Sequence, residues 1–150
     1  MKKPDSLRRA LTGAVTELAQ NPEKLHCFIQ EGRISSTSAR SLSFEYAYTL
    51  EIIVTDYNAD PDTIIVPILA WLRVHQSEML SNPELMQDGF SFEADILNHD
   101  TVDLAIKLKL SERVGVHEEE GHYVIEHYEE PVAEDDVFNM RASTLQDSAL

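Results

Sequence analysis

Three histidines near the carboxyl end have the spacing that most resembles a metal site. His117, His122 and His127 lie five positions apart among carboxylates, and imidazole and carboxylate groups can ligate zinc. The spacing is unfavourable, because His122 comes one residue too late for an H-E-x-x-H helix and Gly121 interrupts the segment. On a strand, His122 and His127 would also point to opposite faces. We therefore predict exposed hairpin histidines and no metal site.

The other candidates for chemistry are explained more simply by structural roles. A calcium-binding loop has ligands at its positions 1, 3 and 5 and a Glu at its end. The spacing of Asp56, Asp60 and Asp62 matches neither feature, so a turn-and-cap role is predicted. Cys27 is the single cysteine and stands in an apolar segment, which is typical of a small core residue. The remaining histidines have no Ser or Cys partner at a recognised local spacing: His26, His75 and His99.

No phosphate-binding loop can be found among the five glycines of the chain. With the motifs above set aside, the sequence predicts no catalytic residue and no cofactor. We therefore expect the protein not to be an enzyme.

The net charge of −15 is unevenly distributed. Residues 1–40 contain seven Lys and Arg against four Asp and Glu, whereas residues 41–150 contain five against twenty-three. Binding to nucleic acid needs clustered Lys and Arg, and only the first nine residues offer a cluster. No apolar run is long enough to span a bilayer. We expect a soluble protein that is made in the cytoplasm and has protein partners, without direct contact to nucleic acid or membrane.

The elements that must position these residues can be read from periodicity. Apolar side chains alternate from Leu42 to Val54, which predicts a strand with one buried face. After a turn at 56–61, apolar residues from Ile64 to Met79 recur at helical spacing, and Pro67 predicts a late helix start or a kink. A first helix, capped by Asp5 or Ser6, is predicted from the stripe Leu7, Leu11, Ala14, Val15 and Leu18.

Further strands complete the domain. Residues 25–34 predict a short hairpin or a strand followed by a Ser-rich loop, and residues 82–89 a turn or a single helical turn. Residues 90–110 predict a hairpin in which Glu93 and Asp95 face Lys107 and Lys109, and a terminal hairpin follows. We predict an α+β domain over 1–130, with two principal helices on one face of a mainly antiparallel sheet. An acidic, flexible tail is predicted for 131–150.

Several segments together resemble the phage tail completion protein R family of contractile-tailed temperate phages and prophages. The segments cover residues 1–128, and none is a catalytic motif. They are KKPDSLRRALTGAV at the start, NPEKLHCFIQEG from Asn21, SLSFEY from Ser41, the strand end at 50–57, VPILAWLRVHQ from Val66, FSFEADIL from Phe90 and LSERV from Leu110.

The resemblance implies a tail-terminator-like fold and a virion-assembly role. Such a protein would cap the head-proximal end of the tail and prepare it for head joining, with tail tube, sheath or other completion proteins as partners. Because tail tubes are built from symmetric rings, we expect a homo-hexameric ring in the virion, assembled in the host cytoplasm. The predicted contact residues are Arg8, Arg9 and Arg40, which would face the acidic carboxyl-terminal half of a neighbour.

Two alternatives stay open from the sequence. The first is a monomeric acidic binding module, for example a DNA-mimicking inhibitor that presents carboxylates to a basic site. The second is an enzyme that holds a metal ion in the His-rich hairpin.

Overall fold

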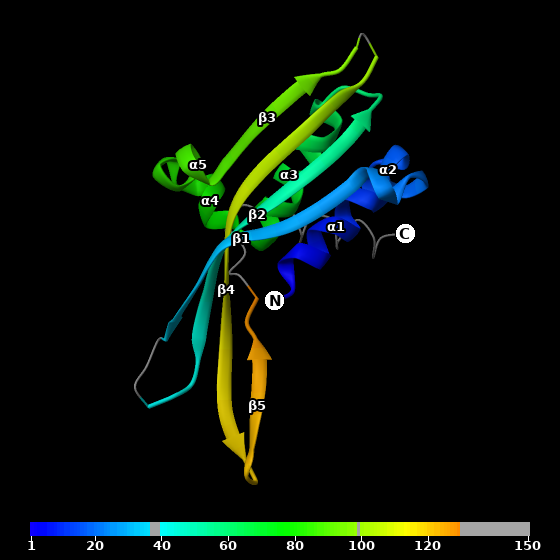
Figure 1. Cartoon of the computed structure of the whole chain (residues 1–150). Helices are drawn as coiled ribbons and strands as arrows, with labels where there is room; N and C mark the ends of the chain where they lie inside the picture. The colour runs from blue at the N-terminus through cyan, green and yellow to red at the C-terminus, as the bar shows by residue number, and fades with distance from the viewer. Residues whose placement is uncertain (37–39, 99, 130–150) are drawn as a thin grey trace, which may run out of the picture.

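The computed structural model describes residues 1–36, 40–98 and 100–129 of the chain. Five antiparallel strands form one sheet in the order β1-β2-β4-β3, and β5 pairs with the far half of β4 (Figure 1). The strands are β1 (Leu25–Ser36), β2 (Phe44–Tyr57), β3 (Phe90–Ile96), β4 (Val102–Glu119) and β5 (His122–His127). The helices are α1 (Lys3–Ala14), α2 (Thr16–Gln20), α3 (Asp62–His75), α4 (Ser77–Ser81) and α5 (Pro83–Gly89), with a 3-10 turn at Pro22–Lys24.

The two principal helices, α1 and α3, lie side by side on one face of the sheet (Figure 1). Their buried side chains, among them Leu7, Leu11, Ile68 and Leu72, meet the even-numbered residues of β2 and β4 in a single core. In the part of the chain that the structure describes, no helix covers the other face of the sheet (Figure 1). The predicted α+β class and the placement of both helices are therefore confirmed.

Strand β2 explains how the buried face is built. Tyr48, Leu50, Ile52 and Val54 are buried, as their two-residue period predicts. The pairing with β4 shifts between Val54 and Tyr57, where Asp56 has a φ of 51°. This bulge moves the buried face to an odd position, so Tyr57 also enters the core.

Both predicted helices are interrupted. The first breaks at Val15, an extended residue between α1 and α2, although Leu7, Leu11, Val15 and Leu18 are all buried as predicted. The second ends at His75, and Gln76 separates it from α4. It begins at Asp62 with Pro67 as its sixth residue, so of the two predicted outcomes the late start is not seen and the kink stays a prediction. Because proline lacks an N–H, the carbonyl of Thr63 has no intrahelical donor there.

Other local predictions need correction. Of the two predictions for residues 25–34, the strand is confirmed and the short hairpin is wrong, because β1 is a single strand of 12 residues that pairs with β2 on both sides of a bulge at Glu31 and Gly32. Residues 83–89 form a helix of 7 residues, longer than the predicted turn or single helical turn. Glu93 lies opposite Ala105 and Asp95 opposite Asp103, so neither faces a lysine, and Lys107 instead lies opposite Glu51. The terminal hairpin is confirmed as β4 and β5.

The single-domain assignment to residues 1–130 stays a prediction. Its predicted acidic tail, 131–150, lies outside the described residues. No helix in the described ranges has both the length and the apolar character needed to cross a membrane.

Candidate assembly surfaces

The buried carboxylate of Glu112 ties the start of the chain to the middle of the sheet. Its Oε1 accepts hydrogen bonds from the backbone N–H groups of Lys2 at 2.7 Å and Lys3 at 3.3 Å, while Tyr48 donates its hydroxyl to Oε2 at 2.5 Å. The free N–H groups and the positive dipole end of α1 are thereby neutralised by strand β4. The prediction that Asp5 or Ser6 caps this helix was wrong, because the cap comes from a distant strand.

A second set of hydrogen bonds surrounds the buried side chain of Lys3. Its Nζ donates to Gln76 Oε1 and to the Ser111 carbonyl, both at 2.6 Å. Gln76 Nε2 in turn donates to Ser111 Oγ at 3.2 Å. Three elements, α1, β4 and the break between α3 and α4, are therefore held by one buried polar network.

Trp71 connects α3 to the same region. Its Nε1 donates to Ser6 Oγ at 3.0 Å, and its ring stacks on His75 with a centroid distance of 4.7 Å. Partial burial lowers the pKa of His75, and the ammonium of Lys3 lowers it further, whereas Glu129 opposes the shift. Burial and the carboxylate of Glu112 raise the pKa of Tyr48, so its hydroxyl stays protonated and able to donate.

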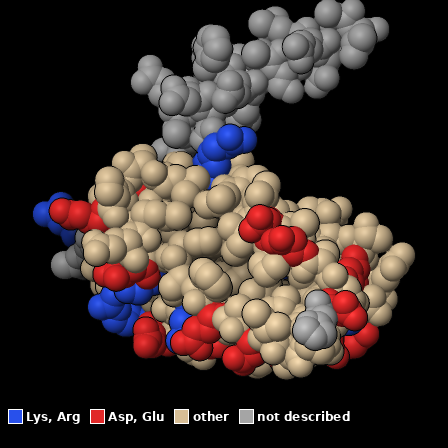
Figure 2. Space-filling view, turned by 90° about the horizontal axis from the view of Figure 1, so that it is seen from above, with Lys and Arg blue, Asp and Glu red and all other residues tan. Residues whose placement is uncertain are grey.

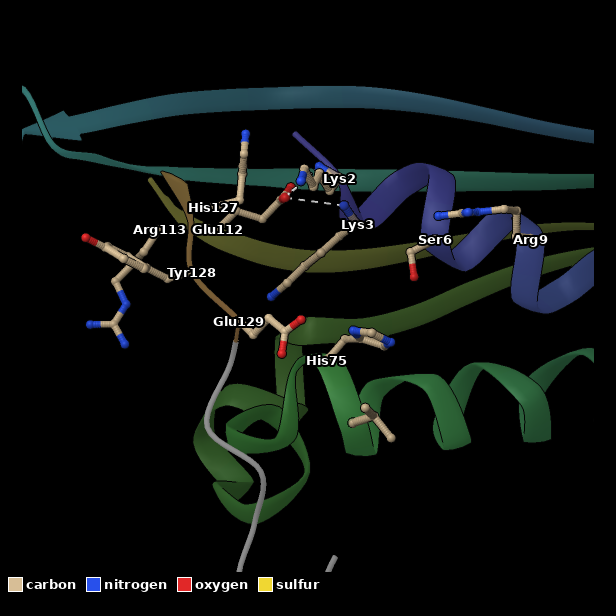
Figure 3. Close-up of a pocket in the computed structure, with 11 residues that line it drawn as sticks. Lys2, Lys3, Ser6, Arg9, His75, Glu112, Arg113, His127, Tyr128 and Glu129 are labelled. Atoms are coloured by element: carbon tan, nitrogen blue, oxygen red, sulfur yellow. Dashed lines mark hydrogen bonds between the residues drawn. The ribbon is translucent and has the colours of Figure 1, made fainter. Parts of the chain in front are cut away.

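A hollow of about 440 Å³ opens beside this network, where the amino terminus, the end of α3 and the end of β5 meet (Figure 3). Its wall mixes cations with the carboxylates of Glu112 and Glu129. The lining residues are Lys2, Lys3, Ser6, Arg9, Val74, His75, Glu112, Arg113, His127, Tyr128 and Glu129. Among the described residues of the wall there is neither a Cys nor a Ser–His hydrogen bond that could activate a nucleophile. We interpret the hollow as a surface for docking and do not assign it a reaction.

The histidines that suggested a metal do not converge. His117 lies opposite Val124, His122 opposite Glu119 and His127 opposite Val114. Across residues 1–36, 40–98 and 100–129, no group of His, Cys, Asp and Glu is arranged to hold a metal ion. Among the aspartates, the predicted turn role is seen just before α3, where Asp60 Oδ1 accepts from the N–H of Asp62 at 2.9 Å, whereas the N-cap position, Pro61, has no side-chain cap.

The three arginines predicted as contact residues occupy different environments. Arg8 is half-buried and donates to the Leu25 carbonyl at 3.1 Å, so it joins α1 to β1. Arg9 is exposed and pairs with Asp5 at 3.4 Å. Arg40 lies at the far end of the sheet, in a hollow that includes Val116 and Tyr123. The structure does not bring the three together, and their role in a contact stays a prediction.

Glu112, Ser111 and Gln76 are functional candidates that sequence reasoning missed. They stand in the LSERV and VPILAWLRVHQ segments, and Lys3 and Ser6 stand in the opening segment KKPDSL. Three of the segments on which the family resemblance rests therefore meet in one buried network. The family resemblance already contained all three segments, and this was the available signal that their residues matter together. The periodicity of the sequence gave no reason to place the segments in contact.

Exposed apolar side chains concentrate at the margins of the sheet. Ile29 and Ile34 lie along β1, Phe92 and Ile96 lie along β3, and Tyr123 and Ile125 lie on the projecting hairpin of β5. Exposed apolar groups at unpaired strand edges are typical of protein–protein contact sites. The structure therefore presents several surfaces suited to assembly.

Comparison with known protein families shows which class of protein carries these surfaces. The family described as P2 phage tail completion protein R matches residues 1–131. The chain belongs to the P2 phage tail completion protein R family. A curated relative, tail completion protein R of Escherichia phage P2, is 50% identical over 131 residues, which cover 87% of this chain and 84% of the relative.

The tail completion protein R family gives the chain a role in completing the phage tail and makes it a virion component. The predicted family is confirmed, and it is a family of structural tail proteins. No solved structure matches the chain. The likeness of its fold to tail terminators therefore stays a prediction.

Proposed function

We propose that the protein caps the head-proximal end of the phage tail and prepares it for joining to the head. The observation that carries the proposal is the family match over residues 1–131, together with 50% identity to tail completion protein R of Escherichia phage P2. The partners would be the tail tube, the sheath or another completion protein. Assembly would take place in the host cytoplasm.

The architecture suits a cap built of several copies. Both lateral edges of the sheet, β1 and β3, expose apolar side chains, and the hairpin of β4 and β5 projects beyond the helices (Figure 1). A symmetric tail tube offers the same contact to every copy, so a ring that repeats the tube symmetry satisfies all contacts at once. A homo-hexameric ring is the form we propose.

Complementation tests this function. The chain is supplied to cells infected with a phage that lacks its own tail completion protein R, and infectious particles are counted while tails are imaged by negative-stain electron microscopy. The proposal predicts that infectious particles return and that tails join heads. Tails of normal length that stay unjoined, with no gain in infectious particles, would contradict it.

A second candidate is an acidic binding module that mimics DNA. One observation favours it: residues 76–103 contain seven carboxylates and neither Lys nor Arg, and five of the seven lie on α4, α5 and β3. On the face shown in Figure 2, acidic side chains are spread along much of the margin. This candidate predicts competition with DNA for a basic protein, and a chain that restores tail joining without such competition excludes it.

A further inference from the structure

We propose that copies of this protein associate head to tail through the two open edges of the sheet, with β1 of one copy beside β3 of the next. The inference rests on the proposed function, in which several copies form a ring on the tail. It adds which two surfaces are in contact, which edge of one copy meets which edge of the next, and the relative direction of the two strands.

Both edge strands are available for pairing. Within the described residues, β1 pairs only with β2, and β3 pairs only with β4, so each has an outer row of backbone groups that faces away from the sheet. A bulge at Glu31 and Gly32 ends the first regular part of β1, which runs from Leu25 to Gln30. That length is close to the 7 residues of β3. An edge strand with free backbone groups is a template for another strand.

Apolar side chains on the two edges share one face. Phe92 lies opposite Ile106, and Ile29 lies opposite Leu50, so both are on the helix-covered side of the sheet. Even so, the helices leave Phe92 63% exposed and Ile29 46% exposed. A sheet that continued from β3 into the next copy's β1 would bring these side chains into cross-strand contact and remove them from water.

Charge selects the partner of each edge. Five carboxylates lie on α4, α5 and β3, and these three elements contain no Lys or Arg, whereas β1 carries one cation, Arg33, and one carboxylate, Glu31. Two β3 edges would therefore repel each other. A β3 edge against the neutral β1 edge avoids this repulsion, which favours a second copy in the head-to-tail arrangement.

Strand direction is consistent with a ring. β1 is antiparallel to β2, β2 to β4 and β4 to β3, so β1 and β3 run in opposite directions. Rotation about an axis along the strands keeps these directions in every copy. The new contact would then be antiparallel, like all the pairs within the chain, and because it joins two different surfaces it repeats until the ring closes.

Solution mass of single-edge variants tests this arrangement. Ile29→Asp alters the β1 edge, Phe92→Asp alters the β3 edge, and Val66→Asp, 62% exposed on α3, is the matched control. Masses are measured by light scattering in low salt under reducing conditions, and circular dichroism checks the fold of each variant. Ile96→Asp, at a site 82% exposed, replaces Phe92→Asp if that variant misfolds.

The inference predicts assemblies larger than a dimer for the wild type and for Val66→Asp, and monomers for each edge variant alone. A one-to-one mixture of the two edge variants keeps one intact contact, so it gives dimers and no larger species. A wild type that is monomeric at every concentration, an edge variant that still assembles alone, or a mixture that stays monomeric would overturn the inference.

The same variants separate this inference from the proposed function. If the monomeric Phe92→Asp chain restores infectious particles as well as the wild type does, the edge contact does not build the ring on the tail and the inference fails, while the tail function stands. If the wild type assembles as described but restores nothing, the function fails and the contact stands.

Discussion

Glu112 accepts a hydrogen bond from the backbone N–H of Lys2 at 2.7 Å, across 110 positions of sequence. Through this contact, strand β4 provides the cap of helix α1. The cap is buried together with the ammonium of Lys3, which Gln76 and Ser111 satisfy. The amino terminus is thus fixed at the centre of the domain, and the surfaces around it are held in one arrangement.

Replacing Glu112 tests the importance of this cap. We expect Glu112→Ala to lower the free energy of unfolding by about 2 to 4 kcal/mol, because the N–H groups of α1 and the hydroxyl of Tyr48 lose a buried acceptor. Urea denaturation followed by Trp71 fluorescence measures the change. Glu118→Ala removes an exposed carboxylate from the same strand and should change the value by under about 0.5 kcal/mol. Equal effects of the two substitutions would disprove the capping role.

Acid should weaken the fold through His75. The folded state holds the pKa of His75 below its ordinary value of 6.5, so the unfolded chain binds more protons as the pH falls through that value. Stability is therefore present above this pH and declines below it. His75→Gln should flatten the decline in part, since desolvation also lowers the pKa of His127. Urea midpoints measured between neutral and mildly acidic pH check this, and an unchanged slope in His75→Gln would count against it.

Arg8 and Arg9 are neighbours in sequence that should contribute differently to the stability of the fold. Arg8→Ala should cost about 1 kcal/mol, because Arg8 donates to the Leu25 carbonyl from a half-buried position. Arg9→Ala should cost under about 0.5 kcal/mol, because both side chains of the Arg9–Asp5 pair are 74% exposed. Thermal and urea unfolding provide the comparison. A larger loss for Arg9 than for Arg8 would reverse this assignment.

Cys27 should behave as a core residue and not as a reactive thiol. Burial raises the pKa of its thiol, and Arg8 opposes this shift only in part. We expect a thiol reagent to modify the folded chain at least about 10-fold more slowly than the urea-unfolded chain. Rates that are equal in the two states would show that Cys27 is accessible, contrary to its packing against the core.

The sequence predicted the parts of this fold that depend on local periodicity. The buried face of β2 and the stripe Leu7, Leu11, Val15 and Leu18 could be identified because burial follows a repeat of two or about four residues. Helix ends could not, because Glu112 caps α1 from a distant strand and Gln76 interrupts the second helix to join the same network. Cross-strand partners such as Glu51 and Lys107 depend on a register set by the whole sheet.

The position of the protein on finished tails tests the central claim most directly. A gold-labelled chain that restores infectivity is located on purified tails by electron microscopy, with the baseplate marking the opposite end. The account predicts label at the head-proximal end alone. Label along the tail, label at the baseplate end, or unlabelled tails that still join heads would contradict it.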